Sequence, residues 1–328
     1  MPANTTPLGA LPARFRRQRL LIVGCGDVGQ RVARHCSAGV HVLALTTTAD
    51  SAQALRAQGI QPLRGNLDQP GTLARLAGLG QRVLHLAPPP LQGWTDPRTL
   101  ALLRALRRRS LPAQLSYVST SGIYGDCDGA WVPESRLPMP QTPRAHRRVD
   151  AEAQLRFWGR SSGVPVQILR APGIYAADRA DGTPVARLQK GTPVLCDADD
   201  VYTNHIHADD LARACLRAVW NGRAQRSYNV NDDTVLKMGD YFDLAADLLQ
   251  LPRPPRVARA GAQAHLSVMV LSFMSESRRL VNTRMKQELR LQLRYPTVQE
   301  GLASLRPSAA QTHSATAARA TPASNSAV

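Results

Sequence analysis

Three glycines near the start of the chain have a spacing that suits phosphate binding. They form the pattern G-x-G-x-x-G, which is made of Gly24, Cys25, Gly26, Asp27, Val28 and Gly29. The pattern directly follows an apolar run at 20–23 and opens a segment of helical spacing, and this context makes an otherwise weak motif informative. The first glycine would permit a tight turn, the second would let a diphosphate approach the backbone, and the third would let helix and strand pack closely. Free N–H groups at the helix start would then hold the anion, so we predict a dinucleotide site rather than a turn without a ligand.

The residues after the second predicted strand bear on which dinucleotide is bound. Proteins that use NAD usually place an acid there, about 20 residues after the turn, to bind the ribose 2′-hydroxyl. Here the positions are Thr46, Thr47 and Thr48, and Asp50 comes too late to match and would instead cap the next helix. Because hydroxyl groups with Arg56 nearby would accept a 2′-phosphate, we favour NADP over NAD.

Short apolar segments alternate with helical segments through the first half of the chain. We predict strands at 20–23, 40–45, 60–63, 83–87, 115–119 and 166–169. Between them, apolar residues recur at helical spacing, as at Val28, Val32 and Cys36. This alternation predicts an α/β fold, a doubly wound parallel (Rossmann) sheet with a smaller C-terminal region that covers the substrate.

Composition divides the chain into four parts. We predict a flexible basic N-terminus at 1–18, a dinucleotide-binding core at 19–170, and a smaller substrate region at 171–306 with some elements returning to the core. Residues 307–328 are mostly Ala, Ser and Thr, and we predict that they are disordered. In the smaller region, Asp209 or Asp210 is expected to cap a helix that follows it.

Charge and cysteine content narrow the class of protein. The 328 residues include 41 Lys and Arg against 24 Asp and Glu, and the three lysines are Lys190, Lys237 and Lys286. The arginines are spread along helical segments with few aromatic residues between them, so we do not expect nucleic-acid binding. Five cysteines without a C-x-x-C pair argue against a disulfide framework. With no long apolar run and no signal-peptide core, we expect a cytoplasmic protein that does not span a membrane.

Three later segments resemble one known family. Residues 116–126 read SYVSTSGIYGD, residues 169–175 read LRAPGIY, and residues 205–212 read HIHADDLA. In this order they resemble the extended short-chain dehydrogenases/reductases of the NAD-dependent epimerase/dehydratase family. The resemblance covers roughly residues 18 to 305 and agrees with the glycine turn.

The resemblance implies a catalytic constellation that this chain has only in part. The family's Ser or Thr that hydrogen-bonds the reacting oxygen corresponds to Thr120. Its Tyr-x-x-x-Lys pair, counted back from the helix residue Glu152, falls on Arg144 and Arg148, and no lysine of the chain has a tyrosine four residues before it. In the family the lysine charge lowers the pKa of the phenol toward neutrality. Arg148 would still anchor the cofactor ribose, but a guanidinium at position 144 cannot transfer a proton.

Two side chains are candidates to replace the missing proton carrier. Tyr124, in the loop beside Thr120, would supply a phenol, and His146 would act near neutral pH. For each residue we favour the alternative, which is that Tyr124 packs as a structural residue and that His146 lies on a solvated helix face among arginines. We rank Tyr124 ahead of His146, so the catalytic candidates are Thr120, Tyr124 and Arg148.

Further cofactor and metal candidates come from the strand ends. Ala87 and Pro88 lie where the family passes the cofactor ribose, and Asn66 or Asp68 lies where it contacts the adenine, with a plain turn as the alternative. The histidines and acids of the segment 205–210 were considered as a metal site, but the resemblance explains this segment without a metal. We therefore predict no metal.

These residues lead to two hypotheses of different classes. The first is an NAD(P)-dependent oxidoreductase or epimerase that acts on a nucleotide-sugar, or on another hydroxyl or carbonyl substrate, by hydride transfer. The second is a catalytically inactive NADP(H)-binding sensor or scaffold, which the missing Tyr and Lys favour. Under either hypothesis the expected partners are a dinucleotide, a small molecule and a second copy of the chain.

Overall fold

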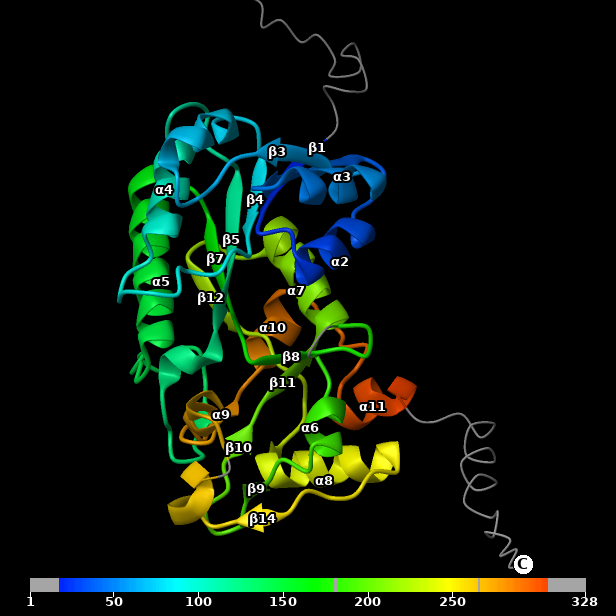
Figure 1. The fold of residues 1–328 in the computed structure, drawn as a ribbon. Helices are drawn as coiled ribbons and strands as arrows, with labels where there is room; N and C mark the ends of the chain where they lie inside the picture. Colours follow the sequence, from blue (N-terminus) through cyan, green and yellow to red (C-terminus); the bar gives the residue numbers. More distant parts are fainter. Residues whose placement is uncertain (1–17, 180–181, 265, 306–328) are drawn as a thin grey trace, which may run out of the picture.

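A seven-stranded parallel sheet forms the centre of the protein (Figure 1). The computed structural model describes residues 18–179, 182–264 and 266–305. From one edge to the other, the sheet is made of β12 (Arg226–Asn229), β7 (Val166–Ala171), β5 (Gln114–Thr120), β4 (Arg82–His85), β1 (Gln18–Val23), β2 (Val40–Thr46) and β3 (Gln61–Arg64). Each neighbouring pair in this order is parallel.

The middle of β1 is apolar on both sides because both faces of the sheet are covered. In β1, Leu20 and Ile22 pack into one hydrophobic core, whereas Leu21 and Val23 pack into another on the opposite face. All four side chains are at most 1% exposed. Continuous apolar runs of this kind are the pattern of a parallel sheet between two helical layers.

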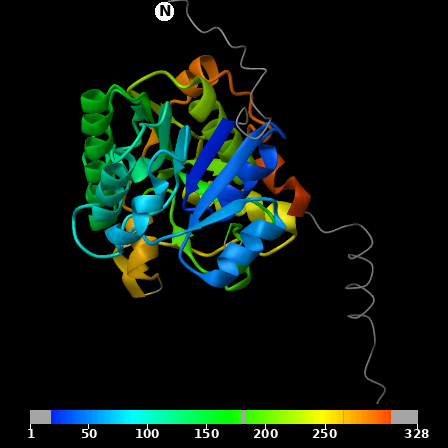
Figure 2. The same cartoon turned by 90° about the horizontal axis from the view of Figure 1, so that it is seen from above.

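Helices cover the two faces of the sheet (Figure 2). One face carries α2 (Asp27–His35), α3 (Ala49–Ala57) and α7 (Ala208–Asn221). The other carries the 3-10 helix η2 (Pro70–Leu76), α4 (Pro97–Leu106) and α5 (Pro143–Ser162). The predicted doubly wound α/β fold is confirmed.

The end of β4 differs from the prediction for a local reason. The strand ends at His85, two residues before the predicted end at Ala87. The N–H groups of Leu86 and Ala87 both donate to the carbonyl of Val23, at 2.7 and 2.9 Å. The chain therefore bends toward the end of β1, and the three prolines that follow have no N–H to extend a ladder.

The second half of the chain builds a smaller region below the carboxyl ends of the sheet strands (Figure 1). Its core is made of Tyr175, Leu188, Val194, Phe242 and Leu302 with their neighbours. Its helices are α6 (Val185–Gln189), α8 (Met238–Leu249), η4 (Arg259–Ala264), α9 (Val268–Phe273), α11 (Val298–Leu302) and η5 (Ala303–Leu305). Helix α10 (Thr283–Glu288) instead packs into the core of the main sheet through Met285. Helix α7 and strand β12 belong to the main sheet instead, so the chain returns to the core between these elements.

Paired short strands connect the smaller region to the loops of the core. The parallel pairs are β8 (Gly173–Tyr175) with β11 (His205–His207), β9 (Val194–Leu195) with β14 (Arg256–Val257), and β6 (Trp131–Val132) with β15 (Arg279–Leu280). The antiparallel pair is β10 (Tyr202–Thr203) with β13 (Leu236–Lys237). The 3-10 helix η3 (Ser121–Tyr124) directly follows β5. The predicted disordered tail and most of the predicted flexible N-terminus lie outside the described residues.

The predicted cap of α7 is wrong. The helix begins at Ala208, so Asp209 and Asp210 lie inside its first turn. The cap is His207, whose Nδ1 accepts the N–H of Asp209 at 3.2 Å. Asp210 is fully buried and instead accepts the backbone N–H groups of Arg294 and Tyr295, which ties α7 to the chain just before α11.

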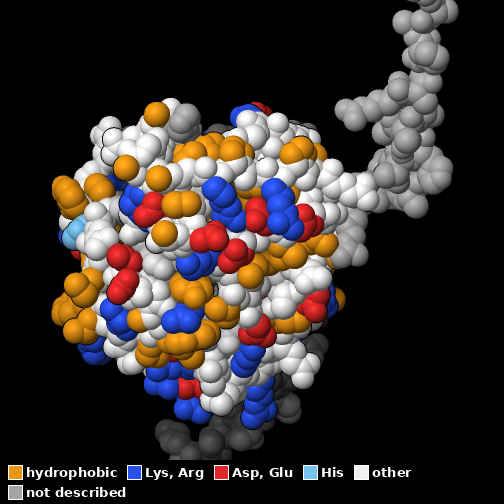
Figure 3. Space-filling model, turned by 90° about the horizontal axis from the view of Figure 1, so that it is seen from below, with side chains coloured by type: hydrophobic (Ala, Val, Ile, Leu, Met, Phe, Trp, Pro, Cys, Tyr) orange, Lys and Arg blue, Asp and Glu red, His pale blue; other side chains and the backbone are white. Residues whose placement is uncertain are grey.

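Acidic and basic side chains alternate on the end of the molecule formed by the smaller region (Figure 3). Arg253 pairs with Asp247 and Arg256 with Asp243, each at 2.7 Å. Part of the excess of arginine is thus matched locally by carboxylates on this face. Among the helices of the described residues, none is long and apolar enough to cross a membrane.

A buried ion pair joins α5 to the sheet. Arg170 on β7 donates to both carboxylate oxygens of Glu152, at 3.2 and 2.8 Å, and the two side chains are 3% and 4% exposed. The guanidinium also donates to the Tyr124 hydroxyl. Removal of one partner from such a pair leaves a buried charge without compensation.

Loss of the Glu152 carboxylate is expected to lower the stability of the fold. For Glu152→Ala we expect the free energy of unfolding to fall by about 3–5 kcal/mol, because Arg170 stays buried without its counter-ion. Urea unfolding followed by circular dichroism measures the change. The control is Asp247→Ala, which removes the carboxylate of an exposed pair and should cost less than about 1 kcal/mol. Equal losses in the two variants would contradict the role of burial.

Candidate functional site

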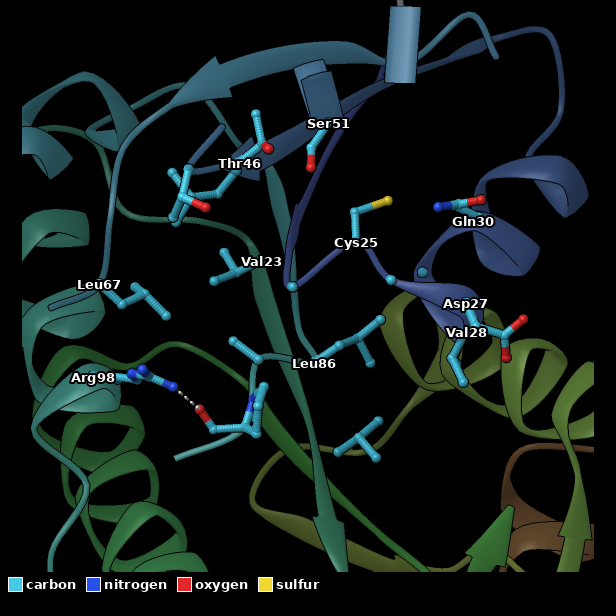
Figure 4. A pocket seen from close by; sticks show the side chains of 18 of the residues that line it. Val23, Cys25, Asp27, Val28, Gln30, Thr46, Ser51, Leu67, Leu86 and Arg98 are labelled. Carbon is cyan, nitrogen blue, oxygen red and sulfur yellow. Dashed lines mark hydrogen bonds between the residues drawn. The ribbon is translucent and has the colours of Figure 1, made fainter. Parts of the chain in front are cut away.

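One large cavity opens at the carboxyl edge of the sheet, around the ends of β1 and β4 (Figure 4). Its volume is about 980 Å³, at the upper end of the range for ligand pockets. It is lined by the glycine turn, by the ends of β2, β3, β4 and β5, and by one residue of α5, Arg148. In a doubly wound sheet this edge is where ligands bind.

The glycine turn has the shape that a diphosphate requires. Gly24 has a φ of 91°, and a Cβ there would lie 2.4 Å from the backbone nitrogen of Ala87. A Cβ on Gly26 would meet nothing within 4 Å, so its absence keeps the start of α2 open to the cavity. A Cβ on Gly29 would lie 3.3 Å from Ile22, which shows how closely α2 packs on β1. The three positions therefore fit the three functions inferred from the motif.

Hydroxyl groups occupy the end of the cavity beside β2. Thr46, Thr47 and Ser51 line it, and Figure 4 shows Thr46 and Ser51 there. No Asp or Glu among the described lining residues belongs to the end of β2 or to α3. The side chain of Arg56 is exposed, and it is not one of the residues that line the cavity. The cavity therefore lacks the acid that would bind a ribose 2′-hydroxyl, and its polar groups here are hydroxyls.

An ion pair borders the cavity between β3 and α4. Arg98 binds both carboxylate oxygens of Asp68 at 2.7 Å, and it also donates to the Pro88 carbonyl at 3.1 Å. The hydrogen bonds from Arg98 lower the pKa of the Asp68 carboxyl, which keeps it charged. Asn66 accepts the Asp68 N–H through its side-chain oxygen. This bridge fixes the loops that follow β3 and β4, and Ala87 is held by its bond to Val23.

The inner end of the cavity contains Thr120 and Arg148. Thr120 lies at the end of β5, and its Oγ1 accepts the N–H of Gly122 at 3.3 Å, which leaves the hydroxyl proton able to donate into the cavity. Arg148 donates through Nη1 to the Tyr117 hydroxyl and to the Val118 carbonyl, both at 2.8 Å. One nitrogen of Arg148 thus anchors it to β5, while the guanidinium borders the cavity.

The two candidate proton carriers lie outside the cavity lining. Tyr124 is fully buried, its hydroxyl donates to Asn229 at 2.7 Å, and it accepts from Arg170 at 2.8 Å. Burial raises the pKa of the Tyr124 phenol, so it holds its proton at neutral pH. His146 packs edge-on against Trp94 with ring centroids 5.0 Å apart. Neither side chain is among the residues that line the cavity with Thr120.

The predicted cofactor residues come together around one space. The cavity lining includes Gly24, Cys25, Gly26, Asp27, Val28, Gly29, Thr46, Thr47, Asn66, Asp68, Ala87, Pro88 and Arg148. Their function as ligands stays a prediction. Sequence reasoning missed Ser51, Leu67, Arg98 and Arg179, which also line the cavity. None of these four belongs to a sequence motif. The tertiary fold brings them to the cavity from segments far apart in the chain.

The histidine-rich segment at 205–210 is packed without a metal-binding arrangement. Among the residues that the structure describes, no group of three or more His, Cys, Asp or Glu side chains is placed to hold a metal ion. His205 stacks on Tyr241 with ring centroids 4.3 Å apart, and burial lowers its pKa to about 4. Its imidazole is therefore neutral at physiological pH.

Comparison with known proteins agrees with this geometry. The model of the NAD dependent epimerase/dehydratase family matches residues 20–231, from β1 to just after β12. This span includes the glycine turn, Thr120 and Arg148. The chain belongs to the NAD-dependent epimerase/dehydratase family. The predicted resemblance is confirmed, and with it an NAD(P)-dependent, oxidoreductase- or epimerase-like character.

Individual relatives cover most of the chain. A GDP-6-deoxy-D-mannose reductase of Pseudomonas aeruginosa is 28% identical over 277 residues, which is 74% of this chain and 86% of the relative. A functionally unknown conserved protein from Silicibacter pomeroyi is 30% identical, with a TM-score of 0.73 over 88% of this chain and 98% of the other. A UDP-glucuronic acid 4-epimerase from Bacillus cereus, solved with NAD, is 17% identical and has a TM-score of 0.69 over 87% and 96% of the two chains. The last likeness shows the fold alone.

Substitution of two glycines of the turn should separate folding from ligand binding. Gly24→Ala is expected to lower the free energy of unfolding by about 1–3 kcal/mol, because its φ is positive and Ala87 blocks the added methyl group. Gly26→Ala should cost less than about 1 kcal/mol, because its methyl group would enter open space. It should nevertheless reduce the rise in melting temperature that NADPH or NADH gives. The opposite ranking of the two stabilities would contradict the packing described for the turn.

Proposed function

We propose that the cavity binds NADP(H) and that the protein acts on a nucleotide-sugar, or on another hydroxyl or carbonyl substrate, by hydride transfer. The observation that carries the proposal is the single continuous cavity, which runs from the start of α2 past β4 to Thr120. The glycine turn would hold the diphosphate, and the hydroxyls beside β2 would hold the adenosine half. Family membership and the reductase relative support the substrate class.

Thr120 would position the reacting oxygen of the substrate. Because its Oγ1 accepts the Gly122 N–H, its own proton is left to donate to an acceptor in the cavity. A hydrogen bond there stabilises the negative charge that develops on a carbonyl oxygen during reduction. The nicotinamide ring would supply or accept the hydride. When a carbonyl is reduced, the oxygen also takes up one proton, which water in the open cavity would provide.

Arg148 would bind the cofactor ribose and add positive charge beside the reacting centre. It occupies the position of the family's lysine, and its contacts with Tyr117 and Val118 hold it at the cavity wall. A guanidinium stays protonated at every useful pH, so Arg148 stabilises charge and does not transfer protons. We therefore expect slow chemistry compared with a site that has a phenol and a lysine.

A second candidate function is the binding of NADP(H) without turnover, as in a sensor or scaffold protein. The observation that favours it is the burial of Tyr124, whose hydroxyl is already bonded to Arg170 and Asn229. With Arg144 at the family's tyrosine position, the described cavity lining contains no tyrosine or histidine as a proton donor. In either case we place the protein in the cytoplasm and expect it to form a homodimer.

A carboxylate added at the end of β2 should reverse the choice of nucleotide. Wild-type protein is expected to bind NADPH more tightly than NADH, because hydroxyls rather than an acid occupy this end of the cavity. Thr47→Asp should weaken NADPH binding at least about tenfold through repulsion of the 2′-phosphate, and it should spare NADH. Isothermal titration calorimetry measures both affinities.

The neighbouring residue provides a matched control. Thr48 caps α3 through its side chain and is not one of the cavity residues. Asp also caps helices well, so Thr48→Asp should preserve α3 and change the NADPH affinity much less than Thr47→Asp does, although Thr48 bonds to Ser51 of the lining. Tighter NADH than NADPH binding by the wild-type protein would contradict the proposed preference.

Turnover tests the two candidate functions against each other. The assay uses GDP-6-deoxy-D-mannose and UDP-glucuronic acid as substrates. Turnover is followed by the absorbance of the cofactor and by chromatography of the sugar. We expect slow turnover that falls about 100-fold in Thr120→Val, because the hydrogen bond to the reacting oxygen is lost. Thr120→Ser should retain it, and Tyr124→Phe should keep kcat within a few-fold. A large loss of kcat in folded Tyr124→Phe would show that the phenol takes part, and tight NADPH binding without turnover of any sugar would favour the sensor.

A further inference from the structure

A carboxylate lies at the place where the proposed diphosphate would bind. Asp27 is the first residue of α2 and lines the cavity beside Gly26, whose backbone is open to the ligand. The N-terminus of a helix attracts anions, but a carboxylate at the same position repels them. The site can hold a diphosphate only if the charge of Asp27 is compensated.

Two arginines compensate Asp27, and one of them is buried and held by carboxylates at all three of its nitrogens. Arg31 is 3% exposed and binds three carboxylates, Asp27 at 3.0 Å, Asp178 at 2.5 Å and Asp209 at 2.6 Å. Its Nε and both terminal nitrogens are each used once. Arg31 therefore holds the three carboxylates together and cannot turn toward a ligand.

The second arginine, Arg179, has its guanidinium at the cavity. Arg179 follows β8 and donates through Nη1 to Asp27 Oδ2 at 2.6 Å. The side chain is 29% exposed and lines the cavity together with Gly26 and Asp27. A guanidinium has five N–H donors in a planar fork that matches phosphate oxygens. The N–H groups of Arg179 that do not bind Asp27 therefore lie near the start of α2.

We propose that Arg179 is a ligand of the cofactor diphosphate and bridges it to Asp27. This inference rests on the proposed function, because it assigns a further residue to the same site. Asp27 holds the guanidinium in place by one edge, and the other edge binds a phosphate oxygen. Arg179 belongs to none of the motifs that carry the family resemblance, and it reaches the site from the loop that leads into the smaller region.

NADPH affinity, measured by isothermal titration calorimetry at fixed salt, tests this assignment. For Arg179→Met we expect binding about 10- to 100-fold weaker, the loss typical of a charge-assisted hydrogen bond. Arg179→Lys keeps the charge but loses the fork, and it should be intermediate. Arg253→Met is the matched control, because Arg253 forms a similar pair with Asp247 outside the cavity lining, and it should bind as the wild type does.

A double variant separates direct binding from mere neutralisation of Asp27. If Arg179 only neutralises Asp27, then Asp27→Asn should make it dispensable, and the double variant Asp27→Asn/Arg179→Met should bind as tightly as Asp27→Asn alone. If Arg179 binds the diphosphate, the double variant should stay about tenfold weaker or more. Equal NADPH affinities of Asp27→Asn and the double variant overturn the proposal. If the Met variants unfold, Asp27→Asn is compared instead with Asp27→Asn/Arg179→Lys. Failure of the wild type to bind any dinucleotide would instead reject the proposed function.

Discussion

The contact between the turn after β1 and the end of β4 determines where this protein can hold a ligand. The backbone of Gly24 passes so close to that of Ala87 that a side chain would not fit, and Val23 binds both N–H groups of the bend after β4. After β1 the chain adds β2 and β3 on one side of that strand. It then crosses over and adds β4 and the later strands of the sheet on the other side. A cleft must open at this point, and α2 begins at its mouth. One half of the cavity then extends toward β2 and β3, and the other toward β5.

The two halves of the site differ in how far they keep the pattern of the family. The turn, the open Gly26 and the hydroxyls beside β2 retain what dinucleotide binding needs. At the inner end, where the resemblance implies the position of the family's lysine, Arg148 contacts the phenol of Tyr117, which is fully buried. Burial raises the pKa of Tyr117 to about 12, so this phenol stays protonated and closed to the cavity. The arrangement therefore stabilises negative charge without a side chain that exchanges protons with the substrate.

Sequence reasoning succeeded where the signal is local and failed where it is not. The glycine turn and the strands could be predicted because an apolar run, a turn and an amphipathic helix are adjacent in the chain. Packing of Tyr124 as a structural residue was one interpretation of the sequence, but its partner could not be predicted, because its hydroxyl meets Asn229, which is 105 residues away. Arg98, in the first turn of α4, and Arg179, in the loop after β8, reach the cavity from segments that carry no binding motif. The cap of α7 was missed because two acids suggested a side-chain cap, whereas the preceding histidine provides it.

The ion pairs at the start of α2 have a consequence for the relation between the two regions. Arg31 joins the glycine turn, through Asp27, to α7 and to the loop after β8, which leads into the smaller region. Three carboxylates pair with two guanidinium groups there, and Arg34 adds positive charge near Asp178. With a diphosphate bound, Arg179 would be shared between Asp27 and the phosphate. Because Arg179 and Asp178 are neighbours on one loop, a dinucleotide in the cavity would hold the beginning of the smaller region against the core. In this fold, a dinucleotide in the cavity and the position of the smaller region would therefore be linked through these ion pairs.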